Sequence, residues 1–130
     1  MTPARADDAA GRALTTLVDE IGLVIGELER ARERAAELQA ERRQGRSWYA
    51  IVDAEERPLI VEQISAAMAS LARAGSGWRR AQAHALHDED VSINRIAVLY
   101  GVTRQRVSTL LRGPEEDSLR EPREDSPART

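Results

Sequence analysis

Near the C-terminal end, polar and basic side chains recur at the spacing that places them on one face of an α-helix. In the segment 104–112, Arg, Gln, Ser and Thr fall on the side of the helical period opposite a stripe of Val and Leu. Arginine, glutamine and hydroxyl side chains carry the hydrogen-bond donors that read base edges, and a single α-helix fits the major groove of DNA. The outward face of this predicted helix comprises Arg104, Gln105, Ser108, Thr109 and Arg112.

Two short helices and a tight turn are the elements that must position this face. Ser92 and Thr103 are residue types that favour N-caps, so we expect helices over 93–99 and 104–112. Gly101 lies between them and permits a positive φ, which a Cβ resists. Aliphatic side chains should be buried between the two helices, namely Ile96, Val102, Val107 and Leu110.

A further helix should precede this pair. Ser76 can cap a helix over 77–87, after a break at residues 75–77, and the acidic residues 88–90 would form the turn that follows. The three helices would make a trihelical unit over 76–112. This segment holds six arginines against three acids, whereas the whole chain carries a net charge of −3. A surface for nucleic acid therefore has to be local to this segment.

The string SINRIAVLYGVTRQRVSTLLR, residues 92–112, resembles the helix-turn-helix of bacterial transcription regulators and is most similar to the type in sigma factor region 4. The spacing of Ala97, Gly101 and Val107 carries the likeness, and Tyr100 departs from it where Leu or Phe is common. The resemblance implies binding of double-stranded DNA. Because the chain lacks the other regions of a sigma factor, the resemblance does not imply a polymerase subunit.

Carried over residue by residue, the resemblance assigns base reading to Arg104, Gln105, Ser108 and Thr109. Arg104 would donate to guanine and Gln105 to adenine, each contact contributing about 1–3 kcal/mol of discrimination. Residues at the edges of this helix and on the helices before it would contact phosphates, which position a protein on DNA. These candidates are Thr103, Arg112, Arg106, Ser92, Arg95, Arg79 and Arg80.

Residues 1–46 are predicted to form one long helix. Apolar and small residues repeat there every 3.5 residues for about four heptads, which is typical of a coiled coil. Val18 and Ile25 widen this stripe, and a wider stripe suits packing against other helices of the same chain as well. Two alternatives follow: homodimerisation through the seam, and an intramolecular bundle helix. The seam consists of Leu14, Leu17, Ile21, Val24, Leu28, Ala31, Ala35 and Leu38.

Two segments remain, residues 47–75 and residues 113–130. Residues 47–75 are predicted to form a short helix capped by Ser47 and a main helix that starts between 55 and 58. The segment 113–130 holds three prolines, six acids against three arginines, and Leu119 as its one aliphatic residue besides alanine. Such a segment cannot bury enough apolar surface to offset chain entropy, so we expect a disordered acidic tail.

Composition excludes several classes of protein. The chain has no cysteine, and hence no disulfide, thiol catalysis or cysteine-ligated metal. The longest apolar run, Ile21 to Gly26, is far shorter than the roughly 20 residues that span a bilayer, and we expect no signal peptide. His84 and His87 lie three apart, but two histidines at a helix end are more often solvated than metal ligands.

The sequence also lacks recognisable catalytic machinery. We find no phosphate-binding loop, no nucleophile–base pair and no carboxylate pair in a recognisable setting. We therefore expect no enzyme, no cofactor, no metal and no small-molecule ligand. All 19 basic residues are arginine, a bias typical of a GC-rich and thus bacterial genome.

These observations together predict an all-α cytoplasmic protein of the nucleoid. It would bind double-stranded DNA sequence-specifically as a small transcription regulator, and as a homodimer joined through the N-terminal helices. Two alternatives are kept: an architectural nucleoid protein, and a protein-interaction adaptor that docks on the transcription machinery.

Overall fold

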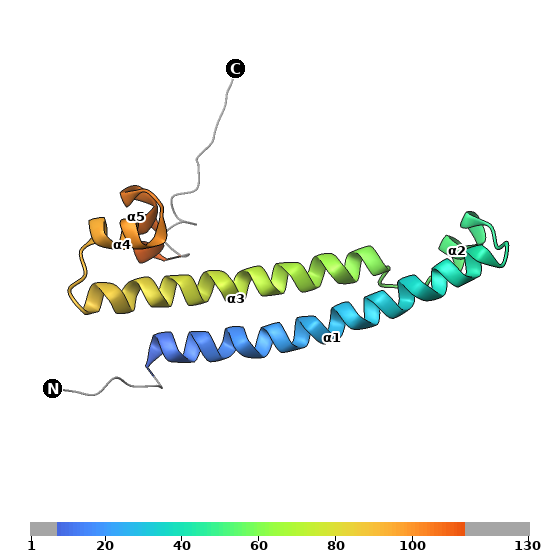
Figure 1. Ribbon diagram of the computed structural model, residues 1–130, viewed down its shortest axis with the longest axis horizontal. Coiled ribbons are helices and arrows are strands. Elements are labelled where there is room, and N and C mark those ends of the chain that lie inside the picture. The colour runs from blue at the N-terminus through green and yellow to red at the C-terminus, as the bar shows by residue number, and fades with distance from the viewer. Residues whose placement is uncertain (1–7, 114–130) are drawn as a thin grey trace, which may run out of the picture. The chain divides into compact units, whose positions relative to one another are not determined.

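The computed structural model describes residues 8–113 of the chain. These residues form five α-helices and no strand, so the predicted all-α fold is confirmed (Figure 1). None of the described helices is long and apolar enough to cross a membrane. The predicted tail, apart from Gly113, lies outside the described residues. The helices are α1 (Ala9–Arg43), α2 (Trp48–Ala54), α3 (Ile60–Asp88), α4 (Ile93–Tyr100) and α5 (Arg104–Arg112).

The chain divides into two compact units. One, which we call the hairpin unit, comprises Leu14–Ser76. The other, the C-terminal unit, combines the described residues that precede the hairpin unit with those from Gly77 onward. Each unit carries one tryptophan, Trp48 in the hairpin unit and Trp78 in the C-terminal unit.

α3 runs unbroken through the glycines at which the sequence predicts a break. Gly75, Ser76 and Gly77 all lie inside α3, so the prediction that Ser76 caps a separate helix is wrong. Glycine lowers helix stability by about 1 kcal/mol relative to alanine, but it keeps its backbone N–H and does not stop a helix as proline does. The predicted helix over 77–87 is therefore the last part of α3.

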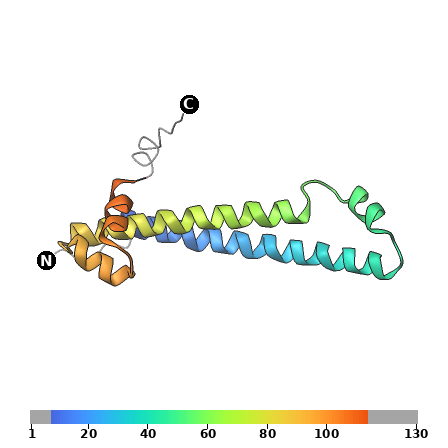
Figure 2. The same cartoon turned by 90° about the horizontal axis from the view of Figure 1, so that it is seen from above.

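Within the hairpin unit, α1 and α3 lie side by side and antiparallel (Figure 1, Figure 2). The most buried side chains on the two helices are small: Val24 and Ala31 on α1 are 3% and 4% exposed, and Ala67 on α3 is 2% exposed. The Ser70 hydroxyl donates to the Glu20 carboxylate at 2.5 Å across the pair. Small side chains at the contact let the helix axes approach closely.

Only half of the predicted α1 seam is covered. Its members at intervals of seven from 17 to 38 are buried or half-buried, whereas Leu14, Ile21 and Leu28 remain 37–41% exposed. The seam is not a single buried stripe, because α3 of the same chain occupies one side of α1. The bundle-helix alternative describes the covered half, and homodimerisation through the N-terminal helix stays a prediction.

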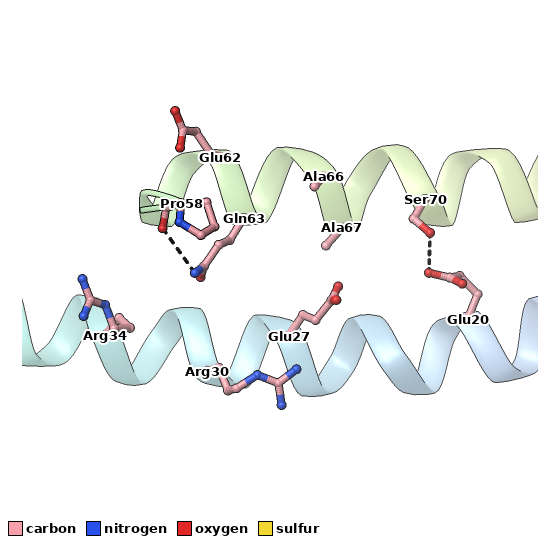
Figure 3. A pocket seen from close by; sticks show the side chains of 10 residues that line it. All are labelled: Glu20, Glu27, Arg30, Arg34, Pro58, Glu62, Gln63, Ala66, Ala67 and Ser70. Atoms are coloured by element: carbon pink, nitrogen blue, oxygen red, sulfur yellow. Dashed lines mark hydrogen bonds between the residues drawn. The ribbon is translucent and has the colours of Figure 1, made fainter. Parts of the chain in front are cut away.

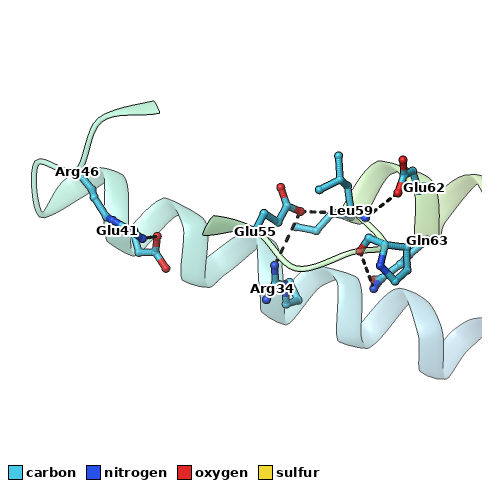
Figure 4. A network of polar contacts seen from close by, with 9 residues as sticks. Arg34, Glu41, Arg46, Glu55, Leu59, Glu62 and Gln63 are labelled. Atoms are coloured by element: carbon cyan, nitrogen blue, oxygen red, sulfur yellow. Dashed lines mark hydrogen bonds and ion pairs between the residues drawn. The ribbon is translucent and has the colours of Figure 1, made fainter. Parts of the chain in front are cut away.

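Polar contacts define where α2 and α3 begin, and Figure 4 shows those at the start of α3. Ser47 caps α2 as predicted, because its hydroxyl accepts a hydrogen bond from a backbone amide at 3.1 Å. α3 begins at Ile60, later than predicted. Glu55 Oε2 accepts from the Ile60 amide at 3.0 Å. Glu62 Oε1 accepts from the Leu59 amide at 2.9 Å, so two carboxylates satisfy donors that a helix start leaves unpaired.

The core of the C-terminal unit joins α4 and α5 to the end of α3. Ile96 and Val107 are fully buried as predicted, and Ala97 is 8% exposed. Leu110 is only half-buried, and the prediction that Val102 is buried is wrong, since it is 39% exposed. Partly buried hydrophobic side chains pack around this centre, namely Leu86, Val91, Ile93, Tyr100 and Leu111.

Replacing Ile96 with alanine should destabilise the C-terminal unit by about 2–5 kcal/mol, because it removes most of a fully buried side chain and leaves a cavity. Val98→Ala, on the same helix but 67% exposed, is the matched control and should change the free energy of unfolding by less than about 0.5 kcal/mol. Chemical denaturation followed by circular dichroism measures both values. Equal effects of the two substitutions would contradict the buried position of Ile96.

Candidate nucleic-acid interface

A left-handed backbone at Gly101 joins α4 to α5. Gly101 has φ 68° and ψ 34°, and its amide donates to the carbonyls of Ala97 and Val98. A Cβ on Gly101 would meet no atom within 4 Å, so the backbone conformation rather than a lack of space favours glycine here. The predicted turn at Gly101 is confirmed.

Both helices of this pair begin with the predicted hydroxyl cap. The Ser92 hydroxyl accepts from the Arg95 amide at 3.1 Å. The Thr103 hydroxyl accepts from the Arg106 amide at 3.0 Å. Each cap satisfies one of the backbone donors that a helix start leaves without a partner, so both first turns are held in place.

The outward face of α5 is open to solvent mainly at its first residues. Arg104 and Gln105 are exposed, whereas Ser108 and Thr109 are half-buried. Arg112 is exposed at the other end of α5, and its guanidinium donates to the Thr109 hydroxyl at 3.2 Å. Of the four predicted base-reading residues, Arg104 and Gln105 are therefore the most accessible to a ligand.

The first turns of α4 and α5 carry arginine at positions where an acidic residue would stabilise the helix. Arg95 is the third residue of α4, and Arg104 and Arg106 are the first and third of α5, while neither first turn holds an acidic residue. A helix dipole makes its N-terminal end positive, so each cation placed there costs about 0.3–1 kcal/mol. The arginines therefore make both helix starts more electropositive, which lowers the stability of the two helices when no anion is bound.

Arg79, a predicted phosphate contact, packs on the ring of Tyr100. Its guanidinium carbon lies 4.2 Å from the ring centre. The Tyr100 hydroxyl donates to Gln82 Oε1 at 2.8 Å, which anchors the ring to α3. Burial raises the pKa of the Tyr100 phenol, and the Arg79 guanidinium opposes part of that rise. The only sequence signal for this arrangement is tyrosine where Leu or Phe is common.

Two predicted phosphate contacts from different helices meet at one shallow hollow. Arg79 of α3 and Arg106 of α5 both line a cavity of about 260 Å³. Two guanidinium groups at one hollow can hold a single anion such as a phosphate through charge-assisted hydrogen bonds. Sequence reasoning missed this pairing because the two arginines lie far apart in the chain. The other residues that line the hollow are Tyr100, Val102, Val107 and Leu110.

Arg80 differs from the other predicted phosphate contacts. It is half-buried, and its Nε is buried without a hydrogen-bond partner among the residues that the structure describes. Its Cδ lies 4.0 Å from where a Cβ on Gly113 would stand. Arg80 therefore packs against the residue that follows α5.

The hairpin unit holds a second hollow, of about 530 Å³, between α1 and α3 (Figure 3). Its charged lining is mixed, with the carboxylates of Glu20, Glu27 and Glu62 and the guanidinium groups of Arg30 and Arg34. Within residues 8–113, no group of three His, Cys, Asp or Glu side chains could hold a metal ion.

Gly101→Ala should lower the free energy of unfolding by about 1–2 kcal/mol, because alanine resists the left-handed conformation. Gly77→Ala makes the same chemical change inside α3, where it should raise the free energy of unfolding by about 0.4–1 kcal/mol. Thermal unfolding of both variants gives the comparison. Shifts of the same sign would contradict the left-handed turn at Gly101.

Comparison of the chain with family models, with curated proteins and with solved structures gives no match. A functional conclusion therefore rests on the residues and the geometry of the α4–α5 pair and of the α3 side chains beside it.

Proposed function

We propose that the protein binds double-stranded DNA sequence-specifically through the α4–α5 helix-turn-helix, as a small bacterial transcription regulator of the cytoplasmic nucleoid. α5 is the recognition helix, and its exposed Arg104 and Gln105 donate to base edges. Ser108 and Thr109 lie further along the same face and make closer contacts once the helix has entered the groove.

The observation that carries this proposal is the arginine at the starts of α4 and α5. Arg95, Arg104 and Arg106 stand where they disfavour the isolated helices. Residues that break a local rule of stability are expected at functional sites. An anion at these helix starts would reverse the sign of the effect, because it would meet both the guanidinium groups and the backbone amides. DNA phosphates supply such anions in a regular array.

The remaining contacts belong to the DNA backbone. Arg79 is held by Tyr100 at a defined place, so it loses little side-chain freedom when a phosphate enters the hollow that it shares with Arg106. Ser92, Thr103 and Arg112 stand at helix ends and complete the set. Such contacts set the position of a protein on the duplex without reading its sequence.

A single helix-turn-helix reads few base pairs, so two copies of the chain are part of this proposal. A homodimer would meet two half-sites about 34 Å apart, or a multiple of that distance, on one face of the duplex. Pairing is assigned to the N-terminal helix, whose exposed apolar residues are not covered within the described chain.

Arg104→Ala combined with Gln105→Ala should abolish the preference for a duplex selected from random sequences, while the helix content by circular dichroism stays unchanged. The chain has another adjacent Arg–Gln pair, Arg43 and Gln44, both exposed at the end of α1. The same double alanine change there is the control and should leave the preference intact. Fluorescence anisotropy with the selected and a scrambled duplex measures both variants.

The outcomes separate the proposed function from its alternatives. Equal binding of the Arg104 and Gln105 double variant to the selected duplex would refute α5 as the recognition helix. Wild-type binding to every duplex with the same affinity would indicate an architectural nucleoid protein. Absence of binding to any duplex at low salt would favour the adaptor.

Arg95→Glu combined with Arg106→Glu should change stability and binding in opposite directions. Glutamate at the third position of a capped helix completes a capping box, so the free energy of unfolding should rise by about 1–2 kcal/mol in total. DNA affinity should fall by at least about 100-fold, with a shallower dependence on salt, because two phosphate contacts become repulsive. Calorimetry and anisotropy measure the two effects. Unchanged affinity in a stabilised variant would refute the assignment of the helix starts to phosphates.

A further inference from the structure

The hairpin unit has an apolar stripe on α1 that α3 does not cover. Exposed aliphatic residues follow one another there at steps of four and three, and each is between 37% and 59% exposed. This stripe contains only the exposed part of the predicted seam, together with Val18 and Ile25, because the seam residues at 17, 24 and 31 are buried or half-buried in the hairpin. It consists of Leu14, Val18, Ile21, Ile25 and Leu28.

α3 carries a matching stripe. Val61, Ile64 and Met68 are 72%, 37% and 41% exposed, and the half-buried Leu71 continues the spacing. On both helices the stripe lies one residue after the inward positions, as Ile25 follows Val24 and Met68 follows Ala67. One residue turns the helix by about 100°, and in an antiparallel pair this same step turns both stripes to the same side of the hairpin.

This side of the hairpin unit is mostly apolar, and its charged residues Glu29 and Arg32 adjoin Ile25 and Leu28 at one end of the α1 stripe. The other positions that flank the two stripes are small or weakly polar, whereas the opposite side holds the charged hollow of Figure 3. A helix surface meant for water normally carries charged residues. The uncharged flanking residues that are exposed are Thr15, Gly22, Ser65, Ala69 and Ala72.

The extent of this mostly apolar face fits a protein interface. Its eight exposed aliphatic side chains leave on the order of 600 Å² of apolar surface open, the upper end of what a monomer usually shows. A stable pair buries about 800 Å² on each partner, so these side chains with their small neighbours supply an area of the required size.

We propose that this face binds the same face of a second copy, so that two hairpin units close into a four-helix bundle. Two apolar stripes on antiparallel helices are self-complementary under a twofold axis, since each stripe meets another of the same length and character. Small flanking residues let the helices of the second copy approach closely. A partner of different sequence would need an equally apolar face to avoid burying an unpaired charge against the two stripes.

This inference names the contact for the pairing that the proposed function requires. It can be tested apart from DNA binding, because the oligomeric state of the full chain is measured without DNA. Sedimentation equilibrium should give twice the chain mass of 14.4 kDa at micromolar concentration. The Arg104 and Gln105 double alanine variant should sediment in the same way, so a failure of DNA recognition leaves this result intact.

Two glutamate variants on α1 provide the matched test. Ile25→Glu places a charge in the middle of the face, where residue 25 is 53% exposed, and should weaken dimerisation by at least about 100-fold. Leu23→Glu makes the same change at a residue that is 63% exposed but lies off the face, and should leave the dimer unchanged. Met68→Glu tests the face independently from α3 and should act like Ile25→Glu.

Circular dichroism of each variant shows whether the helices persist, which is expected because all three side chains are already exposed. A wild-type chain that stays monomeric at tens of micromolar would overturn the proposal and leave this face to another protein. A dimer that survives Ile25→Glu and Met68→Glu with full helix content would overturn it too. Equal weakening by Leu23→Glu would overturn it as well, because a dimer contact confined to this face excludes residue 23.

Discussion

Small side chains at the helix contacts are the constraint on which the rest of the structure depends. Every buried hydrophobic residue in the described part of the chain is alanine, valine or isoleucine. Between α1 and α3 the buried residues are only valine and alanine, so the helices approach closely but remove little apolar area from water, and hydrophobic stabilisation scales with that area at about 25 cal/mol per Å². Leucine, isoleucine and valine side chains beside this contact remain exposed, where they can pack against another protein surface.

In the C-terminal unit, the side chains that stabilise the helix pair and those available for recognition lie on opposite sides of α4 and α5. Ile96 and Val107 fill the centre, and Ala97 lets α4 and α5 cross closely above it. The outward sides of the two helices are then available for polar chemistry. Hydroxyl caps at Ser92 and Thr103 hold the first turns in place although the arginines of those turns oppose the helix dipoles.

Features marked by a local signal or by a sustained repeat, such as the long helix α1, could be predicted from the sequence. Features that depend on competing propensities or on distant partners could not. The caps and the turn at Gly101 depend on neighbouring backbone groups alone. The continuity of α3 through Gly75 and Gly77 depends on the propensity of a 29-residue helix, which absorbs two unfavourable residues. The division of the α1 seam and the stacking of Arg79 on Tyr100 both depend on partners distant in sequence.

The placement of the tryptophans gives each unit an optical signal of its own. Trp48 is 57% exposed, with the Arg42 guanidinium 5.1 Å from its ring, whereas Trp78 is half-buried. Indole emission depends on contact with water, so the two residues report from unlike surroundings. With either indole replaced, fluorescence would follow the opening of one unit at a time. The two signals would then measure whether the units, which share α3, unfold in one cooperative transition.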